Sequence, residues 1–302
     1  MAKSVYTPAE ADMRAGLIAA ASAYVLWGFL PLYIKLVSFA DAREVLGVRI
    51  LWCVPTALIA ILVTSGLRRG LKELQTVLQP RLLGALALSA LFIFANWSIY
   101  VWLVLDHRVM EASLAYFISP LVNVAMGVFL FGERVSGMKL WALGFAALGV
   151  IVQGLALGAP PWMALALCAT WSAYSLIRKQ APVPATTGLL VETLALAAPA
   201  VGLLVWASAE APLAFSDSIG HAALLALAGP VTALPLLLFT FGARRVPFTA
   251  LGLLQYFAPS LQFLIGLAFG ELFTPLRGLS FALIWIGLVL YSWDSIKRTK
   301  MA

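Results

Sequence analysis

The sequence predicts an all-α integral membrane protein with ten transmembrane helices, arranged as two inverted repeats of five. Three observations support this: composition, the length of the apolar runs and an internal repeat. Hydrophobic residues make up 63% of the 302 residues and charged residues 11%, whereas soluble domains are about half apolar and about a quarter charged. The apolar runs of about 20 residues match a hydrocarbon core about 30 Å thick, where helices satisfy their own backbone hydrogen bonds.

The internal repeat pairs residues 111–154 with residues 250–293. A Tyr, a Pro and a Glu recur in the same order around an apolar run: Tyr116, Pro120 and Glu133 in the first copy, and Tyr256, Pro259 and Glu271 in the second. The second copy begins five predicted spans after the first, an odd number, so it enters the bilayer from the opposite side. Residues 1–155 are therefore expected to form the first repeat and residues 156–302 the second.

Taken in order, the apolar runs predict spans near residues 16–36, 42–64, 82–105, 110–131, 137–154, 160–178, 186–207, 219–242, 248–269 and 275–294. Nine spans follow the first one, so we interpret it as a retained helix and not a cleaved signal peptide. Leu67, Leu71, Leu74 and Leu78 have helical spacing between basic residues and predict an amphipathic helix on the membrane surface.

Prolines inside the spans predict kinks, because each removes a helix hydrogen bond. They are Pro31, Pro55, Pro120, Pro199, Pro235 and Pro259, of which Pro31, Pro120 and Pro259 are the expected hinges. Gly266 and Gly270 form a GxxxG pattern that favours close helix packing, compatible with a monomer or a weak dimer.

Charge distribution predicts the orientation. Most of the 20 Lys and Arg residues fall on one side of the predicted bilayer, and the positive-inside rule then places both termini in the cytoplasm. The net charge of +7 comes from the same loops, so it is no argument for a nucleic-acid partner. Cys53 and Cys168 lie inside spans and suggest neither a disulfide nor a metal site.

Inverted repeats are the basis of alternating access in secondary transporters, which favours a transport function. A non-transporting receptor or assembly subunit is the alternative. The chain has no HExxH motif and no GxxxxGK[ST] loop, and its Asp residues lie at or outside span ends. We therefore expect no enzymatic activity, no cofactor and no ATP hydrolysis by this chain. Its partners are the lipid bilayer and a small-molecule substrate, with coupling to protons as one option.

Charged residues deep in the spans are candidates for function, because a buried charge is costly in lipid. We expect Arg49 to attract an anionic part of the substrate, and Glu192, ahead of Glu111, to bind a coupling proton. The alternative is that each simply neutralises a neighbour. Lys35, Glu44 and Glu111 lie near the outer ends of spans, where they form either a gate or a solvated rim.

Polar and aromatic residues inside the spans are expected to line a cavity. They are Trp27, Tyr33, Asn96, Trp97, Tyr100, Tyr116, Ser119, Asn123, Trp171, Tyr174, Gln255 and Tyr256. The alternatives are interfacial anchoring for the aromatic residues and hydrogen bonding between helices for the amides.

Several motifs carry a resemblance along nearly the whole chain: residues 23–35, residues 44–52 with Arg49, Asn96-Trp97, residues 111–123, Gly132-Glu133-Arg134 and Gln255-Tyr256. In these the chain resembles the RarD family of EamA-type permeases in the drug/metabolite transporter superfamily. The resemblance implies two inverted five-helix repeats, a bacterial cytoplasmic membrane, and export of small metabolites or drugs. Members are commonly labelled chloramphenicol-sensitive proteins, and relatives in the superfamily export amino acids. The chain departs from the family pattern at Val48, where the family has His, and at Ser119, where it has Asn.

Overall fold

The structure is a computed structural model that describes residues 8–105, 109–135, 137–155, 162–268 and 275–301. All regular structure in these residues is helical. The first part of the chain forms α1 (Pro8–Gly28), α2 (Leu30–Leu36), α3 (Ala42–Thr64), α4 (Gly66–Val77), α5 (Pro80–Leu105), α6 (Val109–Phe131) and α7 (Gly137–Leu155). The second part forms α8 (Trp162–Gln180), α9 (Ala185–Ala195), α10 (Ala197–Glu210), the 3-10 turn η1 (Ala214–Ser216), α11 (Ile219–Ala226), α12 (Ala228–Ala243), α13 (Phe248–Leu254), α14 (Phe257–Ala268) and α15 (Pro275–Met301).

Several of these helices suit a membrane. Within the described residues, four are long and apolar enough to cross one: Glu10–Leu36, Ala42–Thr64, Pro80–Tyr100 and Ile219–Ala243. The pair α9 and α10 makes a fifth if it counts as one span bent by 47°. Each predicted span falls on one helix or on two consecutive helices. The prediction of an all-α membrane protein is confirmed, whereas the number of crossings stays a prediction.

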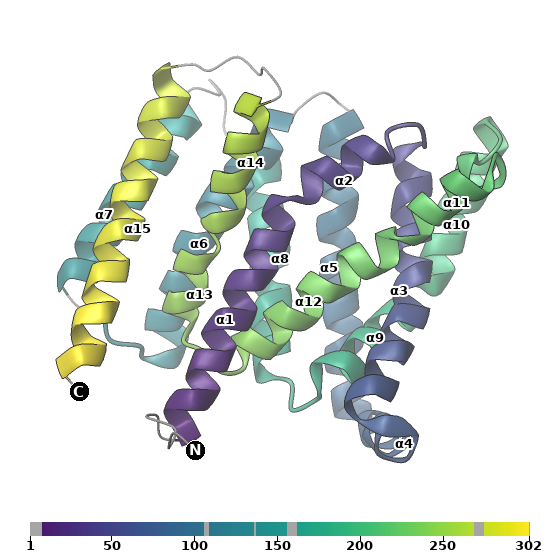
Figure 1. The fold of residues 1–302 in the computed structure, drawn as a ribbon, viewed down its shortest axis with the longest axis horizontal. Coiled ribbons are helices and arrows are strands. Elements are labelled where there is room, and N and C mark those ends of the chain that lie inside the picture. The colour runs from purple at the N-terminus through teal and green to yellow at the C-terminus, as the bar shows by residue number, and fades with distance from the viewer. Residues whose placement is uncertain (1–7, 106–108, 136, 156–161, 269–274, 302) are drawn as a thin grey trace, which may run out of the picture.

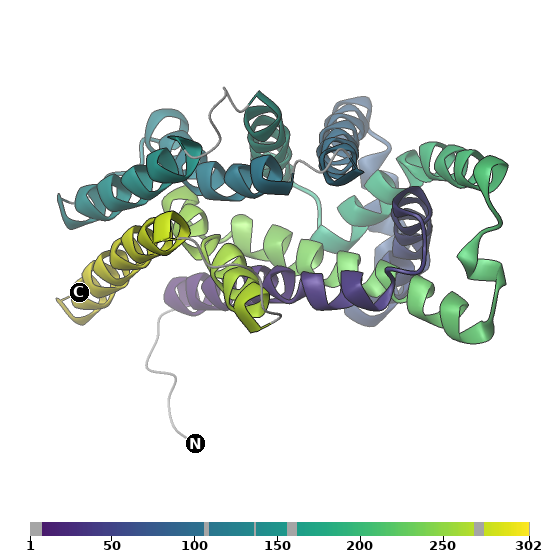
Figure 2. The ribbon, with the colours of Figure 1, turned by 90° about the horizontal axis from the view of Figure 1, so that it is seen from above.

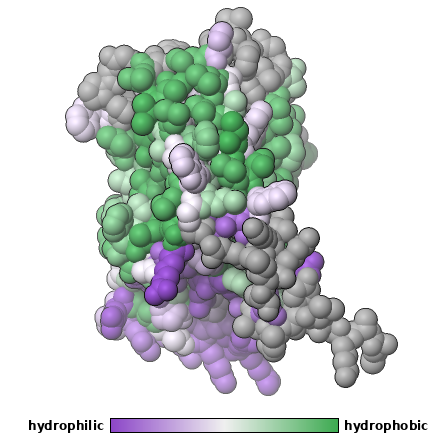
Figure 3. All heavy atoms as spheres, turned by 90° about the vertical axis from the view of Figure 1, so that its left-hand side faces the viewer, coloured by the Kyte–Doolittle hydropathy of each residue, from purple (hydrophilic) through white to green (hydrophobic). Residues whose placement is uncertain are grey.

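One end of the bundle carries much of the positive charge. The start of α1, the helix α4 and the C-terminus lie at the same edge (Figure 1). We call this the basic end, after Arg68, Arg69 and Lys72 on α4 and Arg244 after α12. Figure 3 shows hydrophilic residues gathered at this end and a mostly hydrophobic surface above it. The predicted amphipathic helix is present as α4, and its Leu67, Leu71 and Leu78 are exposed.

Prolines explain where four apolar segments are divided into two helices. The divisions come at Phe29, Leu196, Leu227 and the Gln255–Tyr256 pair, and each lies two to four residues before a proline. These prolines are Pro31, Pro199, Pro230 and Pro259. A proline cannot donate to the carbonyl four residues earlier and its ring clashes with that carbonyl. By contrast, Pro55, Pro120 and Pro235 lie inside undivided helices.

Helices from the two parts of the chain pack against each other throughout the bundle. The pairs in contact are α1 with α12, α5 with α8, α1 with α14, α6 with α8, α3 with α12, α5 with α9, α3 with α9 and α10, α6 with α13, and α7 with α15. Figure 2 shows α7 and α15 side by side at one edge and α10 and α11 at the other. The largest apolar core lies between these two edges of the bundle and includes Tyr24, Ile50 and Phe239.

Candidate functional site

A cavity of about 410 Å³ opens between helices of both parts of the chain. The predicted site residues that line it are Trp27, Pro31, Lys35, Arg49, Asn96, Trp97, Tyr100, Tyr116, Ser119, Trp171, Gln255 and Pro259. Residues of α1 and α2 line the cavity, from Tyr24 as far as Ser38 just after α2. The helix α2 lies at the end of the bundle opposite the basic end (Figure 1). The cavity therefore extends toward that opposite end.

Arg49 is the charged residue that projects from α3 into this cavity. Its guanidinium carbon lies 4.2 Å from the centre of the Trp97 ring, a cation–π contact. Its Nε is buried without a hydrogen-bond partner, and Arg49 makes no hydrogen bond or ion pair to any residue that the structure describes. A guanidinium carries five N–H donors, so Arg49 keeps donors for a molecule inside the cavity.

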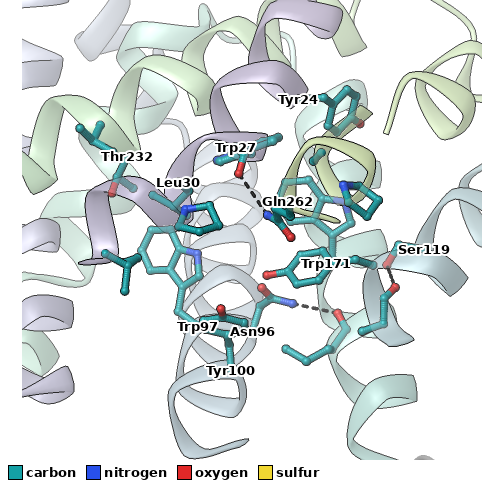
Figure 4. A pocket seen from close by; sticks show the side chains of 18 of the residues that line it. Tyr24, Trp27, Leu30, Asn96, Trp97, Tyr100, Ser119, Trp171, Thr232 and Gln262 are labelled. Carbon is teal, nitrogen blue, oxygen red and sulfur yellow. Dashed lines mark hydrogen bonds between the residues drawn. The ribbon is translucent and has the colours of Figure 1, made fainter. Parts of the chain in front are cut away.

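Indole rings form much of the wall. Trp27 and Trp171 meet edge to face with their ring centres 5.3 Å apart, and Figure 4 shows both, with Trp97, around the same space. Tyr100 and Tyr116 form a second edge-to-face pair at 6.2 Å. The indole N–H of Trp171 is buried and has no partner among the described residues. The wall is thus apolar, with a hydrogen-bond donor still to satisfy.

The amide residues of the site also join helices. Asn96 Nδ2 donates to the carbonyl of Leu167 at 2.8 Å and to Thr170 Oγ1 at 3.0 Å, which links α5 to α8. Gln262 Nε2 donates at 3.1 Å to the Trp27 carbonyl (Figure 4), which Pro31 leaves without its helix donor. The side-chain amides of Asn96 and Gln262 therefore join neighbouring helices, and both residues also line the cavity.

Several predicted lining residues lie outside the cavity. Asn123 is buried behind it and donates to Gln255 Oε1 at 2.8 Å. The hydroxyl of Tyr33 donates to the Leu224 carbonyl, and that of Tyr256 donates to the Phe117 carbonyl. Tyr174 packs in the core against Trp171 and Phe239. The position of these residues inside apolar spans predicted that they are enclosed by the bundle, but not which of them face the cavity.

The predicted gate residues are also dispersed. Lys35 lines the cavity. Glu44 is buried and accepts hydrogen bonds from the backbone N–H groups of Ala214 and Phe215. Nearby, Arg43 donates to Asp41 and Glu210, and its hydrogen bond to Asp41 holds the pKa of that carboxyl below its ordinary value. Glu111 belongs to α6, but its side chain lies outside the described part of the chain, as does Glu271.

Glu192 lies away from the cavity, in a buried polar cluster. Its Oε1 lies 3.4 Å from Arg178 Nε, and both side chains are almost fully buried. Ser89 donates a short hydrogen bond to the same carboxylate, and Arg178 Nη2 donates to the Ala185 carbonyl. Arg178 is the last residue of the predicted span 160–178, and its pairing with Glu192 was not predicted. Its position at the end of an apolar helix gave no sign that the side chain folds back into the core.

A set of contacts joins the two parts of the chain at the basic end. Glu133, after α6, accepts hydrogen bonds from the N–H groups of Phe248 and Thr249, which begin α13. Lys179 Nζ lies 5.7 Å from the centre of the Phe131 ring, which joins the two parts, and it donates to the carbonyls of Ala243 and Val246 within the second part. The rings of Phe131 and Phe248 lie 5.3 Å apart. We call Phe131, Glu133, Lys179 and Phe248 the basic-end closure.

Replacing Glu133 by alanine is expected to destabilise this closure. The change removes a carboxylate from the N-terminus of α13 and leaves two N–H groups without their acceptor, at a cost of about 1.5–3 kcal/mol per charged hydrogen bond. Thermal unfolding in detergent measures the effect. The neighbouring Arg134→Ala serves as the control because Arg134 is exposed. Equal unfolding temperatures for the two variants would contradict this role.

Sequence analysis omitted some residues that line the cavity. They include Tyr24, Leu30, Ile34, Ser38 and Thr232. The missed signal was spacing: residues 24, 27, 31, 34, 35 and 38 recur at three- and four-residue intervals and so share one helix face. Extending that face in both directions from Trp27 would have found Tyr24 and Ser38.

Comparison with known proteins relates the chain to membrane transporters. The model of the EamA-like transporter family matches residues 14–154. Protein RarD of Streptomyces exfoliatus is 40% identical, over 97% of this chain and 92% of its own. An uncharacterized transporter of Vibrio cholerae is 38% identical over 96% of each. A crystal structure with 22% identity aligns with a TM-score of 0.70 over 92% of this chain and 96% of that one, which shows a shared fold.

Proposed function

The chain belongs to the RarD family of EamA-type permeases in the drug/metabolite transporter superfamily, and from this premise we propose that it is a secondary transporter working by alternating access. Its family transports molecules and is not enzymatic. Its substrates are small metabolites or drugs, such as amino acids or amphenicol-like compounds, and the direction of transport is export. The cavity around Arg49, Trp97 and Trp171 is the substrate site. That cavity is the observation on which the proposal depends.

The proposed ten spans are α1 with α2, α3, α5, α6, α7, α8, α9 with α10, α11 with α12, α13 with α14, and α15. The pattern of helix contacts supports two inverted repeats of five. Exchanging each span with its counterpart five places on turns the α1–α12 contact into the α8–α5 contact, and the α1–α14 contact into the α8–α6 contact. The α3–α12 contact likewise becomes the α9–α5 contact, while α7–α15 and α6–α13 map onto themselves. A twofold axis between residues 1–155 and 156–302 accounts for this pattern.

Alternating access follows from such a pair of repeats, because exchanging the conformations of the two halves opens the cavity to the other side. In this conformation the cavity extends toward one end, and the basic-end closure joins the two halves at the other. The excess of Lys and Arg at the basic end supports placing it, and both termini, in the cytoplasm of a bacterial cell. The structure then corresponds to an outward-facing state.

Glu192 is the proposed site of a coupling proton. A buried carboxylate between Ser89 and Arg178 joins three helices, α5, α8 and α9. Protonation would remove its charge, weaken the attraction to Arg178 and loosen the junction. This provides a physical route by which a proton changes how the two halves pack.

Flux measured with the purified protein in lipid vesicles tests the transport function. Candidate metabolites and drugs are first screened for a thermal shift of the protein, and those that bind are then loaded into vesicles with and without a proton gradient. The expected result is protein-dependent flux of at least one ligand. Ligands that bind but never cross, under either gradient direction, would favour a receptor or assembly subunit.

A further inference from the structure

We propose that the cavity selects compact organic anions that carry a ring, with a carboxylate or similar group bound by Arg49 on the face of Trp97. This inference rests on the proposed transport function and narrows its small metabolites to those with a negatively charged group, which leaves out uncharged amphenicol-like compounds. Three features of the cavity support it: its charge, the state of Arg49, and its size and wall.

The charge of the lining is positive. Arg49 and Lys35 both line the cavity, and the residues identified as its lining include no Asp or Glu. Charges far from water are held in place by opposite charges or by hydrogen bonds. Because Arg49 has neither among the described residues, its guanidinium attracts an anion and repels a cation.

Arg49 differs from the other enclosed cations of the chain. Arg178 has Glu192 at 3.4 Å, Arg43 has Asp41 and Glu210, and Lys179 has two backbone carbonyls. Among described residues Arg49 makes no hydrogen bond or ion pair; its guanidinium lies over the Trp97 ring, and its Nε–H is buried and unpaired. A carboxylate is the partner that a guanidinium binds best, through two parallel hydrogen bonds. The ligand would complete the ion pair that the protein itself leaves open.

The size and wall of the cavity favour a compact molecule with a ring. A volume of about 410 Å³ lies near the low end of the range for small-molecule sites, about 300–1,000 Å³. Trp27 and Trp171 offer apolar surface for a ring. Arg49 would hold one end of the ligand and the two indoles the other.

Three probes with the same ring and different charge test this inference: indole-3-acetate, indole-3-acetamide and tryptamine. We expect the purified wild-type protein to bind the acetate at least tenfold more tightly than the neutral amide, and tryptamine least. In vesicles the acetate should also cross fastest. Equal binding of acetate and amide, or no binding of the acetate, would overturn the inference. This comparison needs no variant, so a folding defect cannot obscure it.

Variants then locate the anion site. Arg49→Gln is expected to abolish the preference for acetate over amide, whereas Arg49→Lys should retain part of it, because the charge remains without the planar fork. The matched control is Arg245→Gln at the basic end, where Arg245 pairs with Asp12 on an exposed surface. A full acetate preference in folded Arg49→Gln would contradict the assignment.

Different results would contradict the transport function and the anion site. If vesicles carry a neutral or cationic substrate and ignore the acetate, transport stands and the anion inference falls. If the acetate binds with the expected preference but no probe or screened ligand crosses, the anion site stands and transport falls.

Discussion

Glu192→Ala is expected to lower the free energy of unfolding by about 3–5 kcal/mol, because it leaves the Arg178 guanidinium buried without its carboxylate. The cost comes mainly from the uncompensated charge and less from the lost attraction. Removing both charges, in Glu192→Ala combined with Arg178→Met, should therefore recover much of the loss. Denaturant unfolding of the two single variants and the double variant gives the coupling energy directly.

The control for this cycle is Glu210→Ala, which removes an exposed partner of Arg43. Exposed ion pairs contribute little to stability, because water and salt screen them, so this change should have little effect. If Glu192→Ala costs no more than Glu210→Ala, the buried pair is not the structural element described here.

A milder change, Glu192→Gln, tests coupling separately from stability. Glutamine keeps an oxygen that can accept from Ser89, and it imitates the protonated carboxyl. Flux through this variant should no longer respond to a proton gradient, while exchange of substrate across the membrane continues. Gradient-dependent flux that survives the change would remove Glu192 from the coupling mechanism.

Gly229→Ala is expected to lower the free energy of unfolding by about 1–3 kcal/mol through overpacking. A Cβ at Gly229 would lie far inside contact distance of the Trp52 backbone carbonyl. Since that neighbour is backbone, α12 and α3 would have to separate. Because α3 also carries Arg49, we expect weaker binding of indole-3-acetate as well as a lower unfolding temperature.

Gly202→Ala is the matched control for that substitution. No atom lies within 4 Å of a Cβ built at Gly202 in α10, and alanine favours a helix by up to about 1 kcal/mol over glycine. Gly202→Ala should therefore be neutral or slightly stabilising. A Gly229→Ala protein as stable as this control would show that α3 and α12 do not need their close approach.

The positions of the helices and several residues of the cavity could be predicted from the sequence, because they depend on composition and residue type. Apolar runs determine where helices form, and Trp27, Arg49 and Asn96 were singled out because polar or aromatic groups are unusual at those depths. Whether a side chain faces the cavity could not be predicted, because that depends on the direction in which the side chain points. Tyr33 and Tyr256 turn to backbone carbonyls, and the contacts that set those directions come from helices far away in the sequence.

Prolines show the same limit. Pro31 and Pro259 follow helix breaks, whereas Pro120 lies in an undivided helix that packs tightly against α13. Local sequence predicts a lost hydrogen bond at each of them, but packing against neighbours decides whether the helix divides. Arg178 illustrates the point for charge, because only the folded arrangement brings Glu192 to it.

The central claim is that the basic-end closure must open for substrate to pass. The most direct test is a disulfide between two introduced cysteines, Phe131→Cys and Phe248→Cys, in protein with Cys53 and Cys168 replaced by alanine. The centres of the two native rings lie 5.3 Å apart. Flux in vesicles should fall to background when the pair is oxidised and return on reduction, with single-cysteine variants unaffected. Flux that continues unchanged through fully cross-linked protein would contradict alternating access.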